Sequence, residues 1–348
     1  MNMFQWDHKR PLDVVLLGRI AIDFNPVDYF MTLAASTTFK KYLGGSPANI
    51  AVGLARLQHR VGFIGKVSND RFGDYVHDFF VQEGIDTSHV TRCTDGSSLG
   101  LTFTEILSRD ESSILMYREG AADLKLHPDD VDENYIQSAK LLLLSGTALA
   151  QSPSREAALK AALIAVKTAT PLLFDADYRS YTWKNDDEAA VYMHLAAEKS
   201  DILMGSRAEF DRMERMAGLD GSDKASAAYW LGKGVKLLVI KHGKEGSAAY
   251  LEEGMYRVKP FPVEALKSFG GGDGYGSAFL HGLLLGWRIK DALEFGSASA
   301  SMLVASHACS QDMPKEEAIR EFIQQKKAVY GEHVLGPEPY EMSGGDSL

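Results

Sequence analysis

The chain has 348 residues, of which 45% are hydrophobic and 24% charged, as in an ordinary globular protein. A formal net charge of -10 argues against a nucleic-acid partner, and two cysteines are too few for a disulfide framework or a cysteine zinc site. No apolar run approaches the roughly 18 residues of a membrane span, and residues 1–10 lack a signal-peptide core, so we expect a cytoplasmic protein without a membrane partner.

The first elements alternate between short apolar strands and helices. Residues 12–17 (LDVVLL) and 61–67 (VGFIGKV) are expected to form buried parallel strands. Between them, the turn GGSPAN at 44–49 precedes an apolar helical pattern. Asp23 follows the first strand, at the edge where α/β folds bind ligands, although an aspartate in this place is also typical of a loop cap.

A hairpin is predicted next, followed by a second series of strands and helices. Residues 99–107 and 113–118 flank a charged turn and predict a small accessory sheet. Arg118, at its end, either projects into a cleft or lies in solvent. The alternation that follows predicts a parallel sheet covered by helices on both faces. Its strands are expected at 141–144, 172–175, 202–204 and 235–241.

Three consecutive glycines, Gly270, Gly271 and Gly272, precede Asp273 and a helix of small residues. Glycine gives the backbone unusual freedom, and the unpaired amides and dipole at a helix start form an anion site. A carboxylate in that place is explained if Asp273 takes a proton from a hydroxyl while the amides hold a transferring phosphoryl group. The alternative is an ordinary glycine turn in which Asp273 caps the helix.

The two glycine signatures together are more specific than either alone. Gly44–Asn49 and Gly270–Asp273 resemble, in order and separation, the motifs of the ribokinase-like (PfkB) family of carbohydrate kinases, and the resemblance extends over residues 12–330. It implies a three-layer α/β/α sandwich with a mostly parallel central sheet. It also implies one kinase domain at 1–336. Within this domain a small β lid is expected at about 23–42 and 99–118. A C-terminal tail is expected at 337–348.

The resemblance implies roles for individual residues. Asp273 matches the catalytic base, and the three glycines before it match the anion hole. The positions that hold sugar hydroxyls are matched by Asp23, Gly44, Gly45 and Asn49. The positions that border the nucleotide are matched by Ser206, Lys241, Gly243 and Gly246. Glu209 matches a glutamate that orders Mg²⁺, here expected to act through water.

Three segments point to one substrate class within the family. Residues 116–126, 174–183 and Phe269 are most similar to members that phosphorylate 5-dehydro-2-deoxygluconate in inositol catabolism. Arg118 and Arg179 match arginines that meet the substrate carboxylate in such relatives, and arginine is a planar fork suited to a carboxylate. The resemblance therefore implies phosphorylation of the primary hydroxyl of a keto-deoxy sugar acid with ATP and Mg²⁺, forming the 6-phosphate of 5-dehydro-2-deoxy-D-gluconate.

Several departures from the family pattern leave alternatives open. A 2-keto-3-deoxygluconate kinase or a fructokinase-type enzyme has similar motifs. The substitutions at Ser206, Lys267 and Ala308 leave open a non-catalytic sugar-binding regulatory protein, against which the retained Asp23, Asn49, Glu209 and Asp273 argue. Gly271 replaces a usual alanine, with only a looser loop expected. Lys267 replaces an aspartate that helps to bind potassium, so it either stands in for the ion or points to solvent. Potassium dependence is therefore doubtful, and a homodimer through the lid is an analogy with the family.

Overall fold

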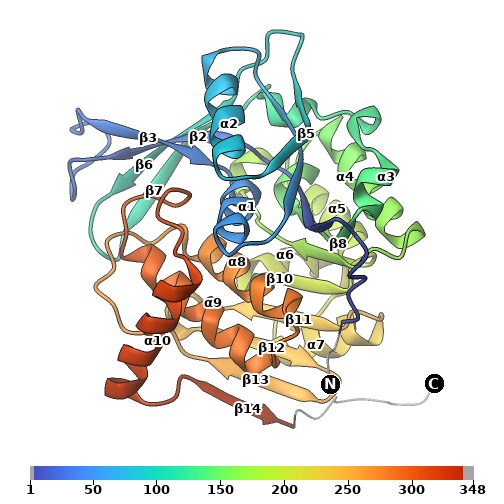
Figure 1. Ribbon diagram of the computed structural model, residues 1–348, viewed down its shortest axis with the longest axis vertical. Helices are drawn as coiled ribbons and strands as arrows, with labels where there is room; N and C mark the ends of the chain where they lie inside the picture. The colour runs from blue at the N-terminus through green and yellow to red at the C-terminus, as the bar shows by residue number, and fades with distance from the viewer. Residues whose placement is uncertain (1–3, 340–348) are drawn as a thin grey trace.

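The computed structural model describes residues 4–339 and is built on a ten-stranded sheet (Figure 1). In spatial order its strands are β14 (Val334–Glu338), β13 (Gly254–Val258), β12 (Ser247–Leu251), β11 (Leu237–Lys241), β10 (Ile202–Ser206), β9 (Leu172–Asp175), β8 (Ala139–Ser145), β1 (Leu12–Leu17), β4 (Val61–Val67) and β5 (Asp86–Arg92). The strands from β5 to β11 in this order pair in parallel, whereas β12, β13 and β14 add an antiparallel edge. The mostly parallel sheet is thus confirmed.

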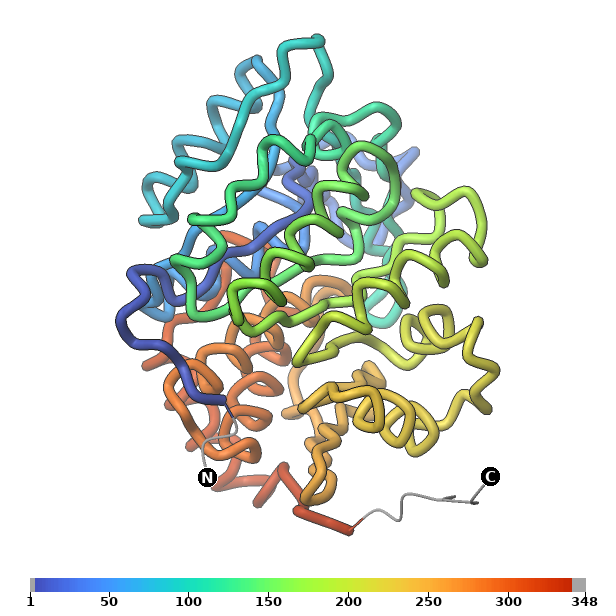
Figure 2. The backbone as a smooth tube through the Cα atoms, turned by 90° about the vertical axis from the view of Figure 1, so that its right-hand side faces the viewer, coloured from blue at the N-terminus to red at the C-terminus, as the bar shows by residue number. Residues whose placement is uncertain are grey.

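Helices cover both faces of this sheet, which explains its apolar strands. In β1, Val15 and Leu17 pack into one core while Val14 and Leu16 pack into the other. The first core is covered by α3 (Glu133–Gln137), α4 (Ser154–Lys167), α5 (Asp186–Ala197), α6 (Arg207–Met213) and α7 (Asp223–Gly232). The second is covered by α1 (Ser46–Arg56), α2 (Arg71–Gln82), α8 (Gly271–Leu284) and α9 (Ile289–Val304), with α10 (Glu316–Tyr330) packed outside α9. Figure 2 turns the first set, green to yellow, toward the viewer.

A separate four-stranded sheet projects from the main body at the upper left of Figure 1. Its order is β3 (Phe39–Gly44), β2 (Ala21–Pro26), β6 (Gly100–Ile106) and β7 (Ser112–Tyr117). The hairpin expected at 99–118 is confirmed, because β6 and β7 pair antiparallel. Asp23 lies within β2, opposite Tyr42, so its interpretation as a loop cap is wrong.

The end of the described chain differs from the prediction. Pro337 and Glu338, which we assign to a tail, belong to β14, where Glu338 pairs with Met255. The physical reason is that β13 would otherwise be the edge of the sheet and leave a row of backbone groups unpaired. Residues 340–348 of the predicted tail lie outside the described residues.

Short 3-10 helices occupy several connections. They are η1 (Ala122–Lys125), η2 (Pro128–Asp130), η3 (Gly146–Leu149), η4 (Ser180–Thr182), η5 (Arg215–Ala217) and η6 (Gly243–Glu245). Across residues 4–339, no helix combines the length and the apolar character that crossing a membrane would require.

Candidate active site

Asp273 is held at the start of α8 by two side chains from the opposite signature. Gly270 precedes the helix in the left-handed conformation, with φ of 84°, and no side chain caps the helix. The Oδ1 atom of Asp273 accepts a hydrogen bond from Ser46 Oγ at 2.7 Å, and Oδ2 accepts one from Asn49 Nδ2 at 2.7 Å. Asp273 therefore does not cap its own helix, and the glycine-turn alternative is wrong on this point.

The environment of Asp273 suits a base that works near neutral pH. Burial raises the pKa of Asp273 to about 6, while the hydrogen bonds from Ser46 and Asn49 oppose the rise and the charge of Asp177 adds to it. A carboxyl group in this range is ionised at pH 7 and still has substantial proton affinity. Ser46 is a site residue that the sequence prediction missed, although it lies inside the GGSPAN signature.

Two of the three glycines before Asp273, Gly270 and Gly271, have a packing reason. A Cβ on Gly270 would lie 2.5 Å from Cys309 Sγ, and one on Gly271 would lie 2.9 Å from Val304 Cγ1 on α9. Gly271 is therefore explained by close helix packing, and the expectation of a merely looser loop is corrected. A Cβ on Gly272 would lie 3.7 Å from Lys241 Nζ, which places a predicted nucleotide-binding cation beside the glycine loop.

The lid contributes a buried carboxylate to the predicted sugar side. Asp23 Oδ1 is buried and has no hydrogen-bond partner among residues 4–339, and burial raises the pKa of Asp23. Gly44 lies against this carboxylate, because a Cβ there would be 2.1 Å from Asp23 Oδ1. Gly45, with φ of 100°, approaches the backbone oxygen of Arg19 in the same way. The buried Asn49 Oδ1 also lacks a partner, so unused acceptors flank the base.

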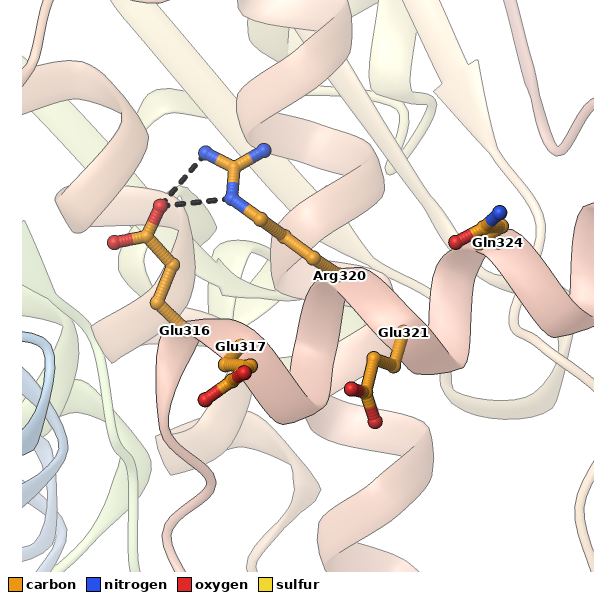
Figure 3. Close-up of a pocket in the computed structure, with 5 residues that line it drawn as sticks. All are labelled: Glu316, Glu317, Arg320, Glu321 and Gln324. Carbon is orange, nitrogen blue, oxygen red and sulfur yellow. Dashed lines mark hydrogen bonds and ion pairs between the residues drawn. The ribbon is translucent and has the colours of Figure 1, made fainter.

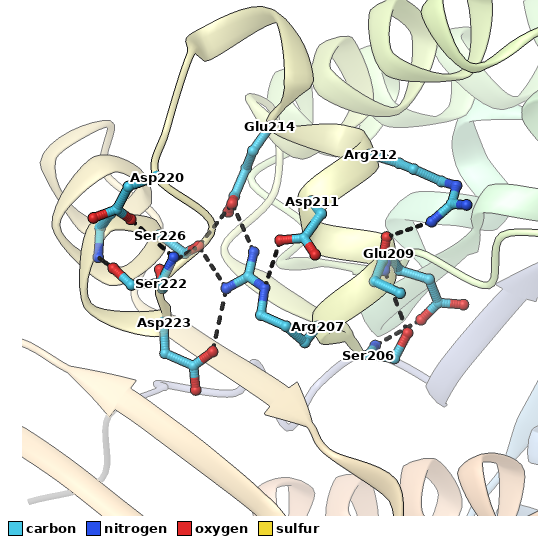
Figure 4. A network of polar contacts seen from close by, with 12 residues as sticks. Ser206, Arg207, Glu209, Asp211, Arg212, Glu214, Asp220, Ser222, Asp223 and Ser226 are labelled. Carbon is cyan, nitrogen blue, oxygen red and sulfur yellow. Dashed lines mark hydrogen bonds and ion pairs between the residues drawn. The ribbon is translucent and has the colours of Figure 1, made fainter.

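The ends of β9, β10 and β11 meet on the predicted nucleotide side. Lys241 Nζ lies 3.6 Å from Asp175 Oδ1, and both residues end their strands. At the start of α6, Ser206 Oγ accepts a hydrogen bond from Glu209 N at 3.3 Å, while Glu209 Oε2 accepts one from Ser206 N at 2.6 Å (Figure 4). Glu209 Oε1 accepts a bond from Tyr178 N at 2.9 Å, which ties this helix to the loop after β9.

A charged network behind Glu209 fixes α6 against α7 (Figure 4). Arg207 donates to Asp211 at 2.8 Å and to Glu214 at 2.8 Å. It also reaches Asp223 at 3.2 Å and Ser226 at 2.8 Å on α7. Since its charge is matched by carboxylates of the protein, this network is explained by structure and needs no ligand.

The two glycines after β11 differ in their surroundings. A Cβ on Gly246, where φ is 100°, would lie 2.0 Å from Val258 O, so the close approach of β13 explains this glycine. Around Gly243, where φ is 56°, a Cβ would meet no atom within 4 Å. Gly243 thus lies beside open space, and the nucleotide role of both residues remains a prediction.

Both arginines expected to bind a carboxylate are already paired. Arg118 donates from Nε and Nη2 to Asp123 Oδ2, at 3.0 and 2.5 Å, and only its buried Nη1 lacks a partner. Arg179 Nη2 lies 2.7 Å from Asp177 Oδ1. A third guanidinium, that of Arg19, is 6% exposed, and the sequence prediction did not include it.

The residues around Asp175 fit a magnesium ion that keeps most of its water ligands. They do not form a site in which protein side chains replace all of those waters. Within residues 4–339, no group of three or more His, Cys, Asp or Glu side chains is arranged to hold a metal. Asp175 Oδ1 is buried without a hydrogen bond among residues 4–339, and the carboxylates whose charges raise its pKa are Asp177, already paired with Arg179, Glu209 and Asp273. Asp273 is the predicted base, so Asp175 and Glu209 are the two carboxylates left for a metal. Because Mg²⁺ keeps several waters and takes one or two carboxylates plus phosphate oxygens, these two groups suit it through water.

Lys267 is completely buried, so the alternative in which it points to solvent is wrong. Its Nζ donates to Ala308 O at 2.6 Å and lies 5.4 Å from the centre of the Phe269 ring. Across residues 4–339 it has no carboxylate within 4 Å. Burial lowers the pKa of Lys267, and the carboxylates of Asp312, Asp273 and Asp23 are among the groups that oppose that shift.

A hollow on the surface of α10 contains none of the predicted site residues. It is lined by Glu316, Glu317, Arg320, Glu321 and Gln324 (Figure 3). Arg320 is paired with Glu316 at 2.7 Å, and every lining residue comes from one exposed face of one helix. The hollow is acidic and offers no acceptor or base in a buried setting, so we assign it no chemistry.

Comparison with known proteins decides the family. Residues 11–316 match the pfkB family of carbohydrate kinases. The chain belongs to this family. It is 61% identical over 335 residues to the 5-dehydro-2-deoxygluconokinase of Clostridium perfringens (strain ATCC 13124), covering 96% of this chain and 99% of the relative. The protein of the same name from Geobacillus thermodenitrificans is 48% identical over 330 residues, with coverages of 94% and 98%.

Solved structures confirm the fold of this PfkB-family kinase. A putative ribokinase II from E. coli, in complex with ATP and Mg²⁺, has a TM-score of 0.82 at 23% identity, covering 90% of this chain and 99% of that one. A fructokinase with bound ATP from Xylella fastidiosa has a TM-score of 0.79 at 22% identity, with the same coverages. The ribokinase-like fold is therefore confirmed. The assignment as a carbohydrate kinase is confirmed by the family match and by the relatives named as kinases.

Proposed function

We propose that this kinase transfers the γ-phosphoryl group of ATP to the primary hydroxyl of 5-dehydro-2-deoxygluconate, giving the 6-phosphate. The observation that carries the proposal is the buried carboxylate of Asp273, held where the uncapped start of α8 meets Ser46 and Asn49 at the start of α1. The relatives named 5-dehydro-2-deoxygluconokinase, which match nearly the whole chain, support the choice of substrate. Asp23 and Asn49 provide the unused acceptors that sugar hydroxyls require.

The geometry supports direct in-line transfer. Asp273 accepts the hydroxyl proton while the substrate oxygen forms its bond to the γ-phosphorus, and the bond from that phosphorus to the β-phosphate oxygen breaks to release ADP. The amides of Gly271 and Gly272 are placed to stabilise the charge on the transferring group, and Lys241 adds a positive charge beside them. Asp175 and Glu209 would hold Mg²⁺ through water, and the ion neutralises phosphate charge when bound.

The lid supplies the other wall of the proposed site. Tyr42 in β3 bonds through its hydroxyl to His307 Nδ1 at 2.7 Å, and His307 Nε2 is 2.9 Å from Pro26 O in β2. The lid is thereby tied to the segment that follows α9. In the proposed cycle it covers the substrate and excludes water, which would otherwise compete for the phosphoryl group.

We also propose that two lids pair to form a homodimer. Apolar side chains are exposed on the lid and its connections, among them Phe30 at 51% and Tyr117 at 61%. Exposed apolar clusters of this kind are typical of protein interfaces. A molar mass near 76 kDa by light scattering is expected, twice the 38.2 kDa of one chain; a monomer at all concentrations would contradict the pairing.

The buried position of Lys267 supports a kinase activity that does not depend on potassium. A Cβ on Gly270 would lie 3.6 Å from Lys267 Cε, so the ammonium is placed directly behind the glycine loop. A second cation about 4 Å away would cost roughly 4 kcal/mol at an effective dielectric of 20. We therefore infer that the lysine supplies the positive field for which an ion would otherwise be needed.

Coupled ADP release with a panel of acceptors tests the proposal. We expect kcat/KM to be highest for 5-dehydro-2-deoxygluconate, lower for 2-keto-3-deoxygluconate, and lowest for fructose. The carboxylate should separate the acids from fructose, and the position of the keto group should separate the two acids. An enzyme that preferred fructose to every keto-deoxy acid would contradict the proposed function.

A further inference from the structure

The guanidinium of Arg19 is buried, and although the charges of Asp23, Asp123 and Asp177 act on it, none of these carboxylates pairs with it directly. Arg19 follows β1 and Gly18 and is 6% exposed, yet the one hydrogen bond of its guanidinium joins Nη1 to the weak acceptor Sδ of Met116, at 3.2 Å. Across residues 4–339, no carboxylate lies within 4 Å of it. A buried charge without a partner is costly, so the unmatched fork indicates a ligand that completes it.

Arg155 shows how the same chain treats a buried arginine with a structural role. It is 8% exposed and donates to Leu149 O at 2.8 Å, to Ala150 O at 2.7 Å and to Glu188 at 3.1 Å. Its donors are thus matched within the protein. Arg19 differs from Arg155 in pairing and not in burial.

The place of Arg19 is next to the proposed sugar site. Its backbone oxygen packs on Gly45, in the turn that also carries Ser46 and Asn49. The charges that act on its guanidinium include Arg118 and Asp23, and burial together with Arg118 lowers the pKa of Arg19. Arg118 brings a second unsatisfied donor, Nη1, because Asp123 holds its Nε and Nη2.

The chemistry of this pair favours a carboxylate over a phosphate of the nucleotide. A guanidinium presents parallel N–H donors that match the two oxygens of a carboxylate. The charges that act on Lys241 are those of Asp175, Glu209, Asp273 and Asp177, whereas those that act on Arg19 are Arg118, Asp23, Asp123 and Asp177. The two cations share Asp177, and only Arg19 is influenced by Asp23 of the lid. A sugar acid that presents its primary hydroxyl to Asp273 has its carboxylate at the opposite end of the carbon chain.

We propose that Arg19 is the specificity-determining residue that binds the substrate carboxylate, with Nη1 of Arg118 as a supporting donor. Arg179, which the sequence resemblance also assigns to the substrate carboxylate, forms an ion pair with Asp177 instead. This inference rests on the proposed function, because it assigns the acidic end of that substrate. It explains why the protein keeps a buried guanidinium without a carboxylate of its own.

The test compares the sugar acid with its amide, in which the carboxylate is replaced by a neutral carboxamide. In Arg19→Met we expect KM for 5-dehydro-2-deoxygluconate to rise about 10- to 100-fold, as for a lost charge-assisted bond. The KM for the amide and for ATP should change less than about threefold, so the preference for the acid disappears. Equal losses on acid and amide would overturn the proposal, because a structural role affects both.

Arg155→Met is the matched control. It removes an arginine of similar burial, so it should lower the melting temperature while the ratio of kcat/KM for acid and amide stays at the wild-type value. If Arg19→Met does not fold, Arg19→Lys replaces it: the fork is lost and the charge is kept, and KM for the acid should rise about tenfold with the amide unaffected. An unchanged KM for the acid in Arg19→Lys would overturn the proposal.

The proposed function and the proposed role of Arg19 can be refuted separately. Wild-type enzyme that releases no ADP with any sugar acid would refute the proposed function. Wild-type enzyme that is active on the acid, together with an Arg19→Met variant that keeps the acid preference, would refute only the role of Arg19.

Discussion

The helices α6 and α8 both begin beside the proposed site, and their first turns are built in opposite ways. At α6, Ser206 and Glu209 cap each other reciprocally, so the backbone N–H groups of these two residues are satisfied by side chains of the helix start itself. At α8, Gly270 provides no side chain, and the carboxylate of Asp273 turns away to Ser46 and Asn49. One helix start is closed, and the other is left open to an anion.

The start of α6 positions a side chain and a loop, whereas the start of α8 provides the site for phosphoryl transfer. The closed start of α6 fixes Glu209 and, through Tyr178 N, the loop after β9. Each oxygen of Glu209 already accepts one hydrogen bond, which suits a contact with magnesium through water. The open start of α8 gives up a cap worth about 1 kcal/mol and gains a site for the transferring phosphoryl group. Substitutions at the two helix starts should therefore have different effects on stability and turnover.

The largest effect is expected for Asp273→Asn. The amide cannot accept the substrate proton, so kcat should fall by about 10²–10⁴-fold, while KM for both substrates changes little. The control is Asp132→Asn, which replaces the cap of α3 by another good cap and should keep full turnover. An Asp273→Asn enzyme within threefold of wild type would contradict the assignment of the base.

Gly270→Ala should have the next largest effect. The new Cβ would lie 2.5 Å from Cys309 Sγ, at a φ of 84° that alanine avoids, so the first amides of α8 must shift. A displacement of about 1 Å at a catalytic group costs around 10²-fold in rate. Steady-state kinetics should show this fall in kcat in protein whose circular dichroism is native. Wild-type turnover in such protein would show that the amides of this loop are not used.

Lys267→Met should reduce turnover about tenfold or more, and wild-type enzyme should not respond to potassium. The reason is that the buried ammonium supplies a positive field behind the glycine loop, whose loss weakens stabilisation of the transferring charge. Rates are to be measured without sodium and potassium, and again with potassium at constant ionic strength. A tenfold rise on adding potassium to wild-type enzyme would contradict this interpretation.

The smallest effect is expected for Ser206→Ala. It removes the side-chain acceptor at the start of α6 and should cost about 0.5–2 kcal/mol of unfolding free energy, read from denaturant titration. Turnover should stay within about threefold of wild type, because Glu209 still bonds to the backbone N–H groups of residue 206 and Tyr178. A large fall in kcat with unchanged stability would show that the hydroxyl itself acts in catalysis.

The fold and the centre of the site could be predicted because they depend on local patterns. Apolar runs such as those of β1 and β8 identify buried parallel strands, and the two glycine signatures identify Asp273 and Asn49. Lys267 was identified as a departure, but only its burial excludes the solvent alternative. Such features follow from short stretches of sequence and from the resemblance to a family.

The pairing of the arginines could not be predicted, because it depends on which distant groups reach each guanidinium. Asp123 holds Nε and Nη2 of Arg118, and Asp177 holds Nη2 of Arg179. Arg19 follows a strand in a position where most arginines are solvated, yet it is only 6% exposed in the folded chain. Residue type and motif position therefore identify candidate arginines, but they do not show which guanidinium has donors free to bind the substrate.

The most direct test of the account is the pH dependence of kcat/KM for the sugar acid, compared between wild type and Asp273→Asn. Because burial raises the pKa of Asp273 to about 6, the base is protonated and inactive below that pH. Wild-type kcat/KM should fall about tenfold per pH unit below 6, and this limb should be absent from the residual activity of the variant. The same limb in both enzymes would contradict the claim that Asp273, at the open start of α8, is the base.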